Sequence, residues 1–331
     1  MGKKIGMLVR NELDLDFDEV FKRAISLGCS VEYVPLNHTP DDAIVAEKAK
    51  GFDYVVAGRE NWSAFALKEC SDKLRFIARF GVGYDTLDLD AAAHSGIAIS
   101  NAPGKNARSV AEQALAMTLS MLRLVTVYDR EMREGPAKAR LSQSLEGTFG
   151  LLGFGNVAQQ LARMLQPFDV SIIAYDLYPN MEAAEKYNVK MTSCDDVLRQ
   201  SDIISLHLPL LPDTKYIIRK ENIDKMKDGV WYVNTARGGH QVEDDLYDAL
   251  VSGKIAGAAI DAFEDEESFI NEPNRLKSLP NVITSPHSAA VSTQGVRDVL
   301  EYCASIVADF HEGREVASIL NPGYKEHAAD R

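Results

Sequence analysis

The chain of 331 residues is long for one hydrophobic core, so its length predicts two domains. Its composition, 46% hydrophobic and 26% charged, is typical of a globular protein, and its formal net charge of −13 argues against nucleic acid or an anionic membrane as partner. No apolar run reaches the roughly 18 residues that a membrane-spanning helix needs, so the sequence predicts none.

The cysteines are scattered along the chain and show no C-x-x-C pair. Such spacing argues against both a disulfide framework and a zinc site. We therefore expect reduced thiols, a cytoplasmic location and no bound metal. The four residues are Cys29, Cys70, Cys194 and Cys303.

The first hundred residues alternate between apolar runs and helical patterns, which predicts a βα repeat and a parallel sheet. The expected strands are Ile5–Val9, Val31–Val34, Tyr54–Ala57 and Phe76–Phe80. The expected helices are Phe17–Leu27, Asp41–Lys50 and Ser63–Cys70. This part of the chain has no nucleotide-binding motif of its own.

A long amphipathic helix is predicted over Asn106–Val125, with Ser109 and Glu112 in a capping-box pattern. Its apolar face is unusually broad. Burial in the core of one domain explains this face, and so does a subunit interface. The sequence alone leaves both interpretations open.

The stretch Gly-Leu-Leu-Gly-Phe-Gly-Asn-Val-Ala, from Gly150 to Ala158, closes an apolar run and opens a helix. Gly153 allows a tight turn, and Gly155 lets the backbone approach a pyrophosphate at the helix N-terminus. Asp176, after the next apolar run, is placed to accept hydrogen bonds from a ribose. Its charge would repel a 2′-phosphate, and the following Leu-Tyr-Pro-Asn offers no cation, so NAD is favoured over NADP.

A second βα series begins at the same fingerprint. Its expected strands are Gly147–Gly153, Val170–Tyr175, Ile203–His207, Val230–Val233, Ile255–Ile260 and Val282–Thr284. Glu264–Pro280 is rich in acidic residues, Asn and Pro and is predicted to be a loop, and Thr293–Glu312 is predicted to be helical. Because the fingerprint lies near the middle of the chain, we expect a nucleotide domain inserted into another domain.

Three segments after the fingerprint each follow a predicted strand: Asn-Thr-Ala-Arg-Gly-Gly ending at Gly239, Asp-Ala-Phe-Glu-Asp-Glu from Asp261, and Ser-Pro-His ending at His287. In open parallel sheets the carboxyl ends of the strands carry the ligand site. We therefore expect these segments to meet at one sheet edge. Other histidines, His240 among them, have no supporting motif.

These motifs in this order resemble the D-isomer-specific 2-hydroxyacid dehydrogenase family, together with Gly81-Val-Gly-Tyr-Asp85, Asn101-Ala-Pro-Gly and Ser109-Val-Ala-Glu. The resemblance implies two doubly wound α/β domains with parallel sheets, a Rossmann NAD domain inserted into a flavodoxin-like substrate domain. The substrate domain would be residues 1–101 and 291–331, and the NAD domain residues 102–290. It also implies a homodimer, with the helix at 106–125 between domains and subunits, and an active site between the domains.

The resemblance implies that Arg237, Glu266 and His287 are catalytic. The chemistry suits each residue type. Arg237 would hold the carboxylate of a 2-oxo acid and polarise its carbonyl. His287 would donate a proton to the carbonyl oxygen as hydride arrives, and Glu266 would orient the imidazole and favour its protonated form. Glu266 is chosen among its acidic neighbours because the family's acid lies five residues after Asp261.

The same resemblance implies further binding residues. The backbone N–H groups of Val82 and Gly83 would help to bind the substrate carboxylate. The residues expected on the cofactor are Gly153, Gly155, Asn156, Val157, Asp176, His207, Thr214, Thr235, Ala236 and Asp261. Two positions depart from the family pattern: Glu267 stands where Pro usually follows the acid, and Asn156 stands where Arg is common.

The substrate is less constrained. Arg59 and Arg79 resemble the phosphate-binding arginines of D-3-phosphoglycerate dehydrogenases, which favours 3-phosphoglycerate as the first interpretation. Reduction of glyoxylate or hydroxypyruvate is the alternative. A different class also stays open, since C-terminal-binding-protein corepressors share this fold and the Arg–Glu–His set and act as NAD-sensing scaffolds. They carry a Trp soon after the His, and Ser288 to Thr293 contains none.

Overall fold

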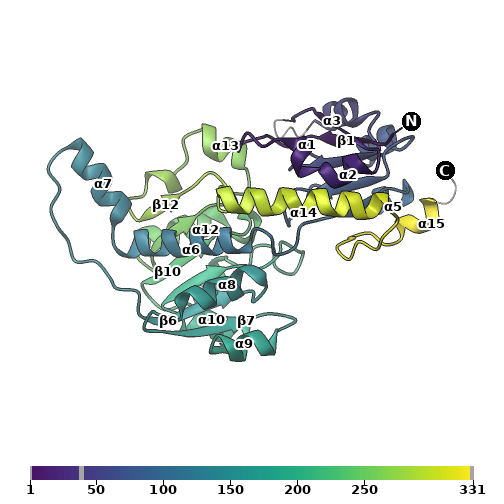
Figure 1. Ribbon diagram of the computed structural model, residues 1–331. Coiled ribbons are helices and arrows are strands. Elements are labelled where there is room, and N and C mark those ends of the chain that lie inside the picture. The colour runs from purple at the N-terminus through teal and green to yellow at the C-terminus, as the bar shows by residue number, and fades with distance from the viewer. Residues whose placement is uncertain (1, 37–40, 329–331) are drawn as a thin grey trace. The chain divides into compact units, whose positions relative to one another are not determined.

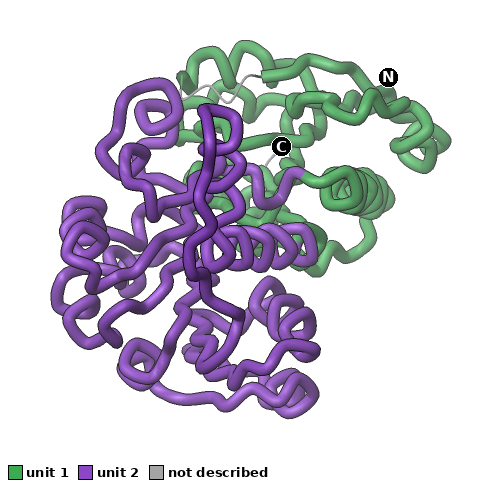
Figure 2. The backbone as a smooth tube through the Cα atoms, turned by 90° about the vertical axis from the view of Figure 1, so that its left-hand side faces the viewer, with its two compact units in different colours: residues 1–106, 292–331 green, residues 107–291 purple. Residues whose placement is uncertain are grey.

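The computed structural model describes residues 2–36 and 41–328. They form two compact units (Figure 2): unit 1 comprises the chain up to Asn106 and from Ser292 onward, and unit 2 is Ala107–Val291. These boundaries lie a few residues from the predicted ones. The segment after residue 101 stays with unit 1, because the Ala102 N–H donates to the Gly81 carbonyl at 2.9 Å.

Unit 1 is built on a five-stranded sheet of order β2-β1-β3-β4-β5, in which every pair is parallel. Figure 1 shows the helices and strands of both units, coloured by residue number. The strands are β1 Lys4–Met7, β2 Ser30–Tyr33, β3 Tyr54–Ala57, β4 Phe76–Arg79 and β5 Ala98–Ser100. The predicted strands are present, and β5 is a strand that we did not expect. This order is that of flavodoxin-like sheets, as the family resemblance implied.

Helices cover both faces of the first sheet. Phe21 and Ala24 pack with Val299 and Cys303 in one apolar core, and Val45, Leu67 and Ala92 belong to the other. The helices are α1 Phe17–Val20, α2 Lys22–Ser26, α3 Asp42–Ala49, α4 Ala64–Cys70, α5 Leu89–His94, α14 Thr293–His311 and α15 Tyr324–Ala328. The helix predicted over residues 17–27 is divided at Phe21, and α5 was not expected.

Unit 2 is built on a seven-stranded sheet of order β12-β11-β10-β9-β6-β7-β8, again parallel throughout. The strands are β6 Gly147–Leu152, β7 Val170–Tyr175, β8 Val189–Met191, β9 Ile203–Leu206, β10 Val230–Asn234, β11 Ile255–Ile260 and β12 Val282–Thr284. The order reverses at β6, which is the topological switch point of a Rossmann sheet. The short edge strand β8 was not expected.

Helices of unit 2 also form two layers. Residues of α6 and α8 build the core on one face of the sheet, and residues of α10 and α12 build the other. The helices are α6 Ala107–Leu122, α7 Val125–Glu134, α8 Asn156–Leu165, α9 Met181–Lys186, α10 Cys194–Gln200, α11 Lys220–Ile223, α12 Glu243–Ser252 and α13 Glu266–Asn271. The prediction of a loop over residues 264–280 is therefore wrong at α13, a short helix that Asp265 caps by accepting the Ser268 N–H at 3.0 Å.

The prediction of one helix over residues 106–125 is wrong at its end. Leu124 has a left-handed φ of 57°, and the axis bends by 60° between α6 and α7. Ser109 is a buried residue inside α6 rather than its N-cap. One face of α6 is core, with Ala111, Ala114 and Met117 buried.

Among the described residues, no single helix has the length and apolar character to cross a membrane, although the bent pair α6 and α7 together meets that criterion.

Candidate active site

The fingerprint turn joins β6 to α8 as the motif predicts. Gly153 has a φ of +97°, and a Cβ at this position would lie 2.7 Å from the carbonyl carbon and oxygen of His207. Only glycine combines that conformation with so close an approach to the chain leaving β9. A Cβ at Gly155, by contrast, would meet open space. The N-terminus of α8 is thus accessible to an anion.

Asp176 follows β7 and lies against the fingerprint turn. Its carboxylate accepts the Phe154 N–H at 2.7 Å and the Tyr178 N–H at 2.9 Å. The carboxylate is therefore held beside the glycine turn, where the motif expects a ribose. Leu177 and Tyr178 are largely exposed, which leaves apolar surface next to this carboxylate.

Two residues that follow β9, His207 and Thr214, were predicted to contact the cofactor. The His207 Nε2 atom lies 2.8 Å from Ser205 Oγ, and burial lowers the His207 pKa to about 4, so the ring is neutral at pH 7. Thr214 donates its hydroxyl to the Pro209 carbonyl at 2.6 Å and closes the following turn.

Thr235, just after β10, is 7% exposed, and its hydroxyl has no hydrogen-bond partner among the described residues. A buried hydroxyl without a partner is costly. A bound dinucleotide would supply one, so the residues around β6, β9 and β10 fit NAD.

Arg237 lies on a tight turn after β10. The side chain of Asn234 accepts the Ala236 N–H at 2.9 Å and donates to the Arg237 carbonyl at 3.0 Å. Gly238 packs backbone against backbone: a Cβ there would lie 1.9 Å from the carbonyl carbon of Phe263 and 2.1 Å from the Glu264 nitrogen. The Arg237 turn is thereby pressed against the segment that leads to Glu266.

His287 follows β12 in a loop that is anchored on Asp261, at the end of β11. The Ser288 and Ala289 N–H groups each donate to the buried Asp261 carboxylate at 2.9 Å, and the Ser285 hydroxyl donates to it at 2.5 Å. Asp261 as a cofactor residue stays a prediction; in the structure its carboxylate holds the histidine loop.

The imidazole of His287 is hydrogen-bonded through Nδ1 to the carboxylate of Glu266, the first residue of α13. Neighbouring acids have other partners, since Glu264 accepts the Tyr216 hydroxyl at 2.8 Å and Asp265 caps the helix. Glu267 is exposed. The structure therefore selects Glu266 from the acidic run as the partner of His287.

The Gly-Val-Gly loop belongs to unit 1, and all four carbonyls from Phe80 to Gly83 accept hydrogen bonds from within that unit. Arg79 donates to the Phe80 carbonyl at 2.5 Å and to the Gly83 carbonyl at 2.9 Å. The Ala102 N–H reaches Gly81 at 2.9 Å, and the Asn101 amide reaches Val82 at 2.7 Å. A loop whose carbonyls are occupied in this way presents its N–H groups to an anion.

Arg79 itself is only 6% exposed. Near it lies Glu60, which is fully buried; burial raises the pKa of its carboxyl group, against the opposing effects of backbone hydrogen bonds and of the Arg79 charge. We predicted Arg79 as a phosphate ligand. In the structure its guanidinium donates hydrogen bonds to two carbonyls of its own loop. Glu60 was missed, because nothing local in the sequence marks a buried acid; Asn101 was quoted only as part of a family motif, and its bond to the Val82 carbonyl depends on the fold.

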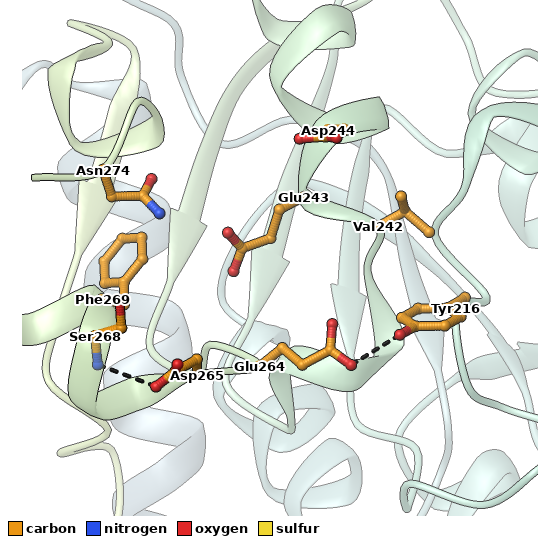
Figure 3. Close-up of a pocket in the computed structure, with 9 residues that line it drawn as sticks. All are labelled: Tyr216, Val242, Glu243, Asp244, Glu264, Asp265, Ser268, Phe269 and Asn274. Atoms are coloured by element: carbon orange, nitrogen blue, oxygen red, sulfur yellow. Dashed lines mark hydrogen bonds between the residues drawn. The ribbon is translucent and has the colours of Figure 1, made fainter.

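A cavity of about 550 Å³ lies beside α13 (Figure 3). Its polar lining is mainly carboxylate, from Glu243, Asp244, Glu264 and Asp265, and burial raises the pKa of Glu243. Such a lining repels an anionic oxo acid. The cavity is therefore a neighbour of the Glu266–His287 pair rather than the place where we expect substrate.

The predicted residues divide between the units. Arg59, Arg79, Val82 and Gly83 belong to unit 1, and the others belong to unit 2. In unit 2 the Arg237 turn, Asp261 and the His287 loop leave the adjacent strands β10, β11 and β12 at their carboxyl ends.

Comparison with known proteins agrees with this arrangement. The model of the family "D-isomer specific 2-hydroxyacid dehydrogenase, NAD binding domain" matches residues 115–289. The chain belongs to the D-isomer-specific 2-hydroxyacid dehydrogenase family. The matched segment nearly coincides with unit 2, which is thereby the NAD-binding domain of the family.

Individual relatives differ in substrate. A D-3-phosphoglycerate dehydrogenase of Archaeoglobus fulgidus is 36% identical over 76% of this chain, and the match covers 48% of that relative's length. A hydroxypyruvate reductase of Thermotoga maritima is 40% identical over 70% of this chain and 76% of its own. The structure of D-lactate dehydrogenase from Aquifex aeolicus, complexed with NAD and lactic acid, aligns with a TM-score of 0.79 at 27% identity, covering 94% of this chain and 96% of that one.

The chain thus spans about half the length of the phosphoglycerate dehydrogenase relative.

Proposed function

We propose that this protein interconverts a D-2-hydroxy acid and the corresponding 2-oxo acid with NAD as cofactor. The observation that carries the proposal is the hydrogen bond between His287 Nδ1 and Glu266 at the carboxyl edge of the unit 2 sheet. A carboxylate-bound imidazole and a dinucleotide-binding turn at the same edge of one sheet are the two functions that hydride transfer to a carbonyl needs.

NAD would be held by the fingerprint turn, with its pyrophosphate at the N-terminus of α8 and its adenosine ribose on Asp176. The open space at Gly155 and the unpartnered Thr235 hydroxyl support this placement. The family resemblance implies that Val157 and Ala236 would also contact NAD. When bound, the nicotinamide supplies or accepts the hydride.

His287 would move the proton. Because Nδ1 is bonded to Glu266, the proton exchanged with the substrate oxygen is assigned to Nε2. In reduction the protonated ring donates that proton to the carbonyl oxygen, and in oxidation the neutral ring removes it from the hydroxyl. Glu266 stabilises the protonated ring and keeps it in one orientation.

The carboxylate of the substrate would be held by Arg237 and by the N–H groups of Val82 and Gly83. A guanidinium recognises a carboxylate with two parallel hydrogen bonds. The inward-held carbonyls of the Gly-Val-Gly loop support the contribution of its N–H groups. Together these contacts would orient the 2-oxo acid so that its carbonyl faces the proton donor.

For the substrate we propose a short unphosphorylated 2-oxo acid such as hydroxypyruvate or glyoxylate. The supporting observation is Arg79, whose guanidinium is buried and donates to its own loop. These bonds argue against a phosphate role for Arg79, one of the two arginines on which a phosphate site was predicted. 3-Phosphoglycerate remains the second candidate, supported by Arg59 after β3 and by the phosphoglycerate dehydrogenase relative.

The test is NADH oxidation with glyoxylate, hydroxypyruvate, 3-phosphohydroxypyruvate and pyruvate, each with the wild type and with His287→Ala. We expect an unphosphorylated acid to have the highest kcat/KM. A tenfold lead of 3-phosphohydroxypyruvate, about 1.4 kcal/mol of transition-state preference, would reverse the substrate assignment, and its loss in Arg59→Ala would locate the phosphate. Turnover of none of the four, or full activity of His287→Ala, would reject the enzyme proposal in favour of an NAD-sensing scaffold.

We further propose a homodimer whose interface extends from the predicted helix at 106–125 to α7 and the segment after it, and a cytoplasmic location. Helix α7 has no buried residue, and Val125, Met132 and Leu141 are 53%, 67% and 101% exposed. A second copy would cover these apolar side chains. Sedimentation of the wild type and of Met132→Glu tests the dimer, since a charge at the interface would give a monomer.

The proposed cytoplasmic location rests on the four cysteines, which are free thiols.

A further inference from the structure

A buried histidine next to Arg237 has no role in the mechanism above. His240 ends the short 3-10 helix Gly238–His240 and is 0% exposed. Its Nδ1 atom lies 3.0 Å from the Arg237 carbonyl oxygen, and its Nε2 atom lies 3.2 Å from the Pro209 carbonyl oxygen. The ring therefore bridges the turn that carries Arg237 and the loop that follows β9.

The two ring contacts are not equivalent. Burial lowers the His240 pKa, against the opposing effect of the two carbonyl contacts, so at neutral pH the ring is uncharged and carries one N–H. Both neighbours are carbonyl oxygens, and only one of them can receive that hydrogen. The Arg237 carbonyl is the nearer of the two to the ring, at 3.0 Å compared with 3.2 Å for the Pro209 carbonyl. We therefore assign the hydrogen to Nδ1.

The Arg237 carbonyl belongs to a buried polar network. It also accepts the Asn234 amide at 3.0 Å, and the same amide donates to Gln241 at 3.0 Å. Gln241 accepts the Tyr232 hydroxyl at 3.1 Å as well. Asn234, Gln241 and Tyr232 are all fully buried. Networks of this kind hold a backbone in one arrangement, because any displacement leaves a buried polar group without its partner.

We propose that His240 is a positioning residue for the reaction: its Nδ1–H fixes the backbone of Arg237 and so the place from which the guanidinium reaches the substrate carboxylate. The inference rests on the proposed role of Arg237. A displacement of about 1 Å in a substrate-binding group can cost about a hundredfold in rate. Loss of one of the two buried side-chain bonds to this carbonyl should cost less, about tenfold in kcat/KM.

The test compares His240→Asn with His240→Gln. An Asn amide can donate from near the Nδ1 position and a Gln amide from near the Nε2 position, so the two variants bury the same polar group but keep different bonds. We expect His240→Asn to stay within threefold of wild type in kcat/KM for glyoxylate. His240→Gln should fall about tenfold, mainly through KM, with unchanged NADH affinity. His240→Leu should match His240→Gln in kcat/KM.

Equal activity of folded His240→Gln and wild type would overturn the inference, and so would a loss confined to His240→Asn. Arg237→Gln separates this failure from failure of the proposed function. If Arg237→Gln is inactive while the His240 variants are not impaired, only the role of His240 is wrong. If Arg237→Gln retains full activity, the proposed substrate site itself is wrong.

Discussion

Asp261 holds the backbone of His287 in a conformation that a residue with a Cβ seldom adopts. His287 has a φ of 51°, and its N–H donates to the Asp261 carbonyl oxygen at 2.9 Å. The Asp261 carboxylate secures the next two residues through their N–H groups. Left-handed backbone at such a residue costs free energy and persists where surrounding contacts enforce it. The orientation of the histidine thus depends on a carboxylate one strand away.

Replacing Asp261 with Ala should therefore impair both stability and catalysis. The Ser288 and Ala289 N–H groups would lose their acceptors, at a cost of about 1–3 kcal/mol each if they stay buried. We expect a lower free energy of unfolding in urea and at least a tenfold fall in kcat. Asp261→Asn keeps one acceptor oxygen, so its free energy of unfolding and its kcat should lie between those of wild type and Asp261→Ala. An Asp261→Ala enzyme with wild-type kcat would show that the loop does not need this anchor.

Glu266 should matter for catalysis where its neighbour Glu264 does not. Removing the charge in Glu266→Gln deprives the protonated imidazole of its stabilising partner, and kcat/KM should fall by about a hundredfold, within the range of general acid–base effects. The matched control is Glu264→Gln, because Glu264 is bonded to Tyr216 rather than to His287. Steady-state kinetics of both variants check this, and similar losses in the two would contradict the assignment.

Stability should fall in mild acid because of His207. Its pKa is about 4 in the folded protein, compared with about 6.5 in an unfolded chain. Between these values the unfolded state binds a proton that the native state excludes, so the free energy of unfolding decreases as pH falls from about 6.5 to about 4. At pH 5 the loss from this residue is at most about 2 kcal/mol.

His207→Gln removes the titrating group and should flatten this part of the pH dependence. The measurement is urea unfolding at pH 7.5 and at pH 5, with the exposed His94→Gln as control. We expect His207→Gln to lose less stability than wild type between the two pH values, and His94→Gln to follow wild type. Identical pH dependence of all three proteins would exclude His207 as a source of the acid sensitivity.

Two adjacent glycines should respond differently to a methyl group. At Gly238 a Cβ would lie 1.9 Å from backbone carbon of Phe263, which cannot yield without moving the segment that carries Glu266. At Gly239 the nearest atom is a flexible Leu210 methyl at 3.0 Å. Gly238→Ala should lower the thermal midpoint and should reduce kcat/KM by about tenfold or more. Gly239→Ala should change both quantities much less. Equal tolerance at the two positions would rule out the close backbone approach.

The sequence by itself determined those features that depend on neighbours in the chain. Alternating apolar runs and helical patterns predict parallel α/β units, since the period of each pattern reports its own element. The fingerprint from Gly150 to Ala158 and the acid at Asp176 likewise form one βαβ unit. The order of the motifs led to the family, which the match to residues 115–289 confirms.

The tertiary structure decided what depends on residues far apart in the chain. The bend at Leu124, the edge strand β8 and helix α13 follow from packing, which local patterns do not report. The family's spacing pointed to Glu266 within an acidic run, and the fold brings its carboxylate to His287. The bonds that Arg79, Asp261 and His240 make in the fold could not be predicted from the sequence, because most of them join backbone atoms, which every residue type supplies.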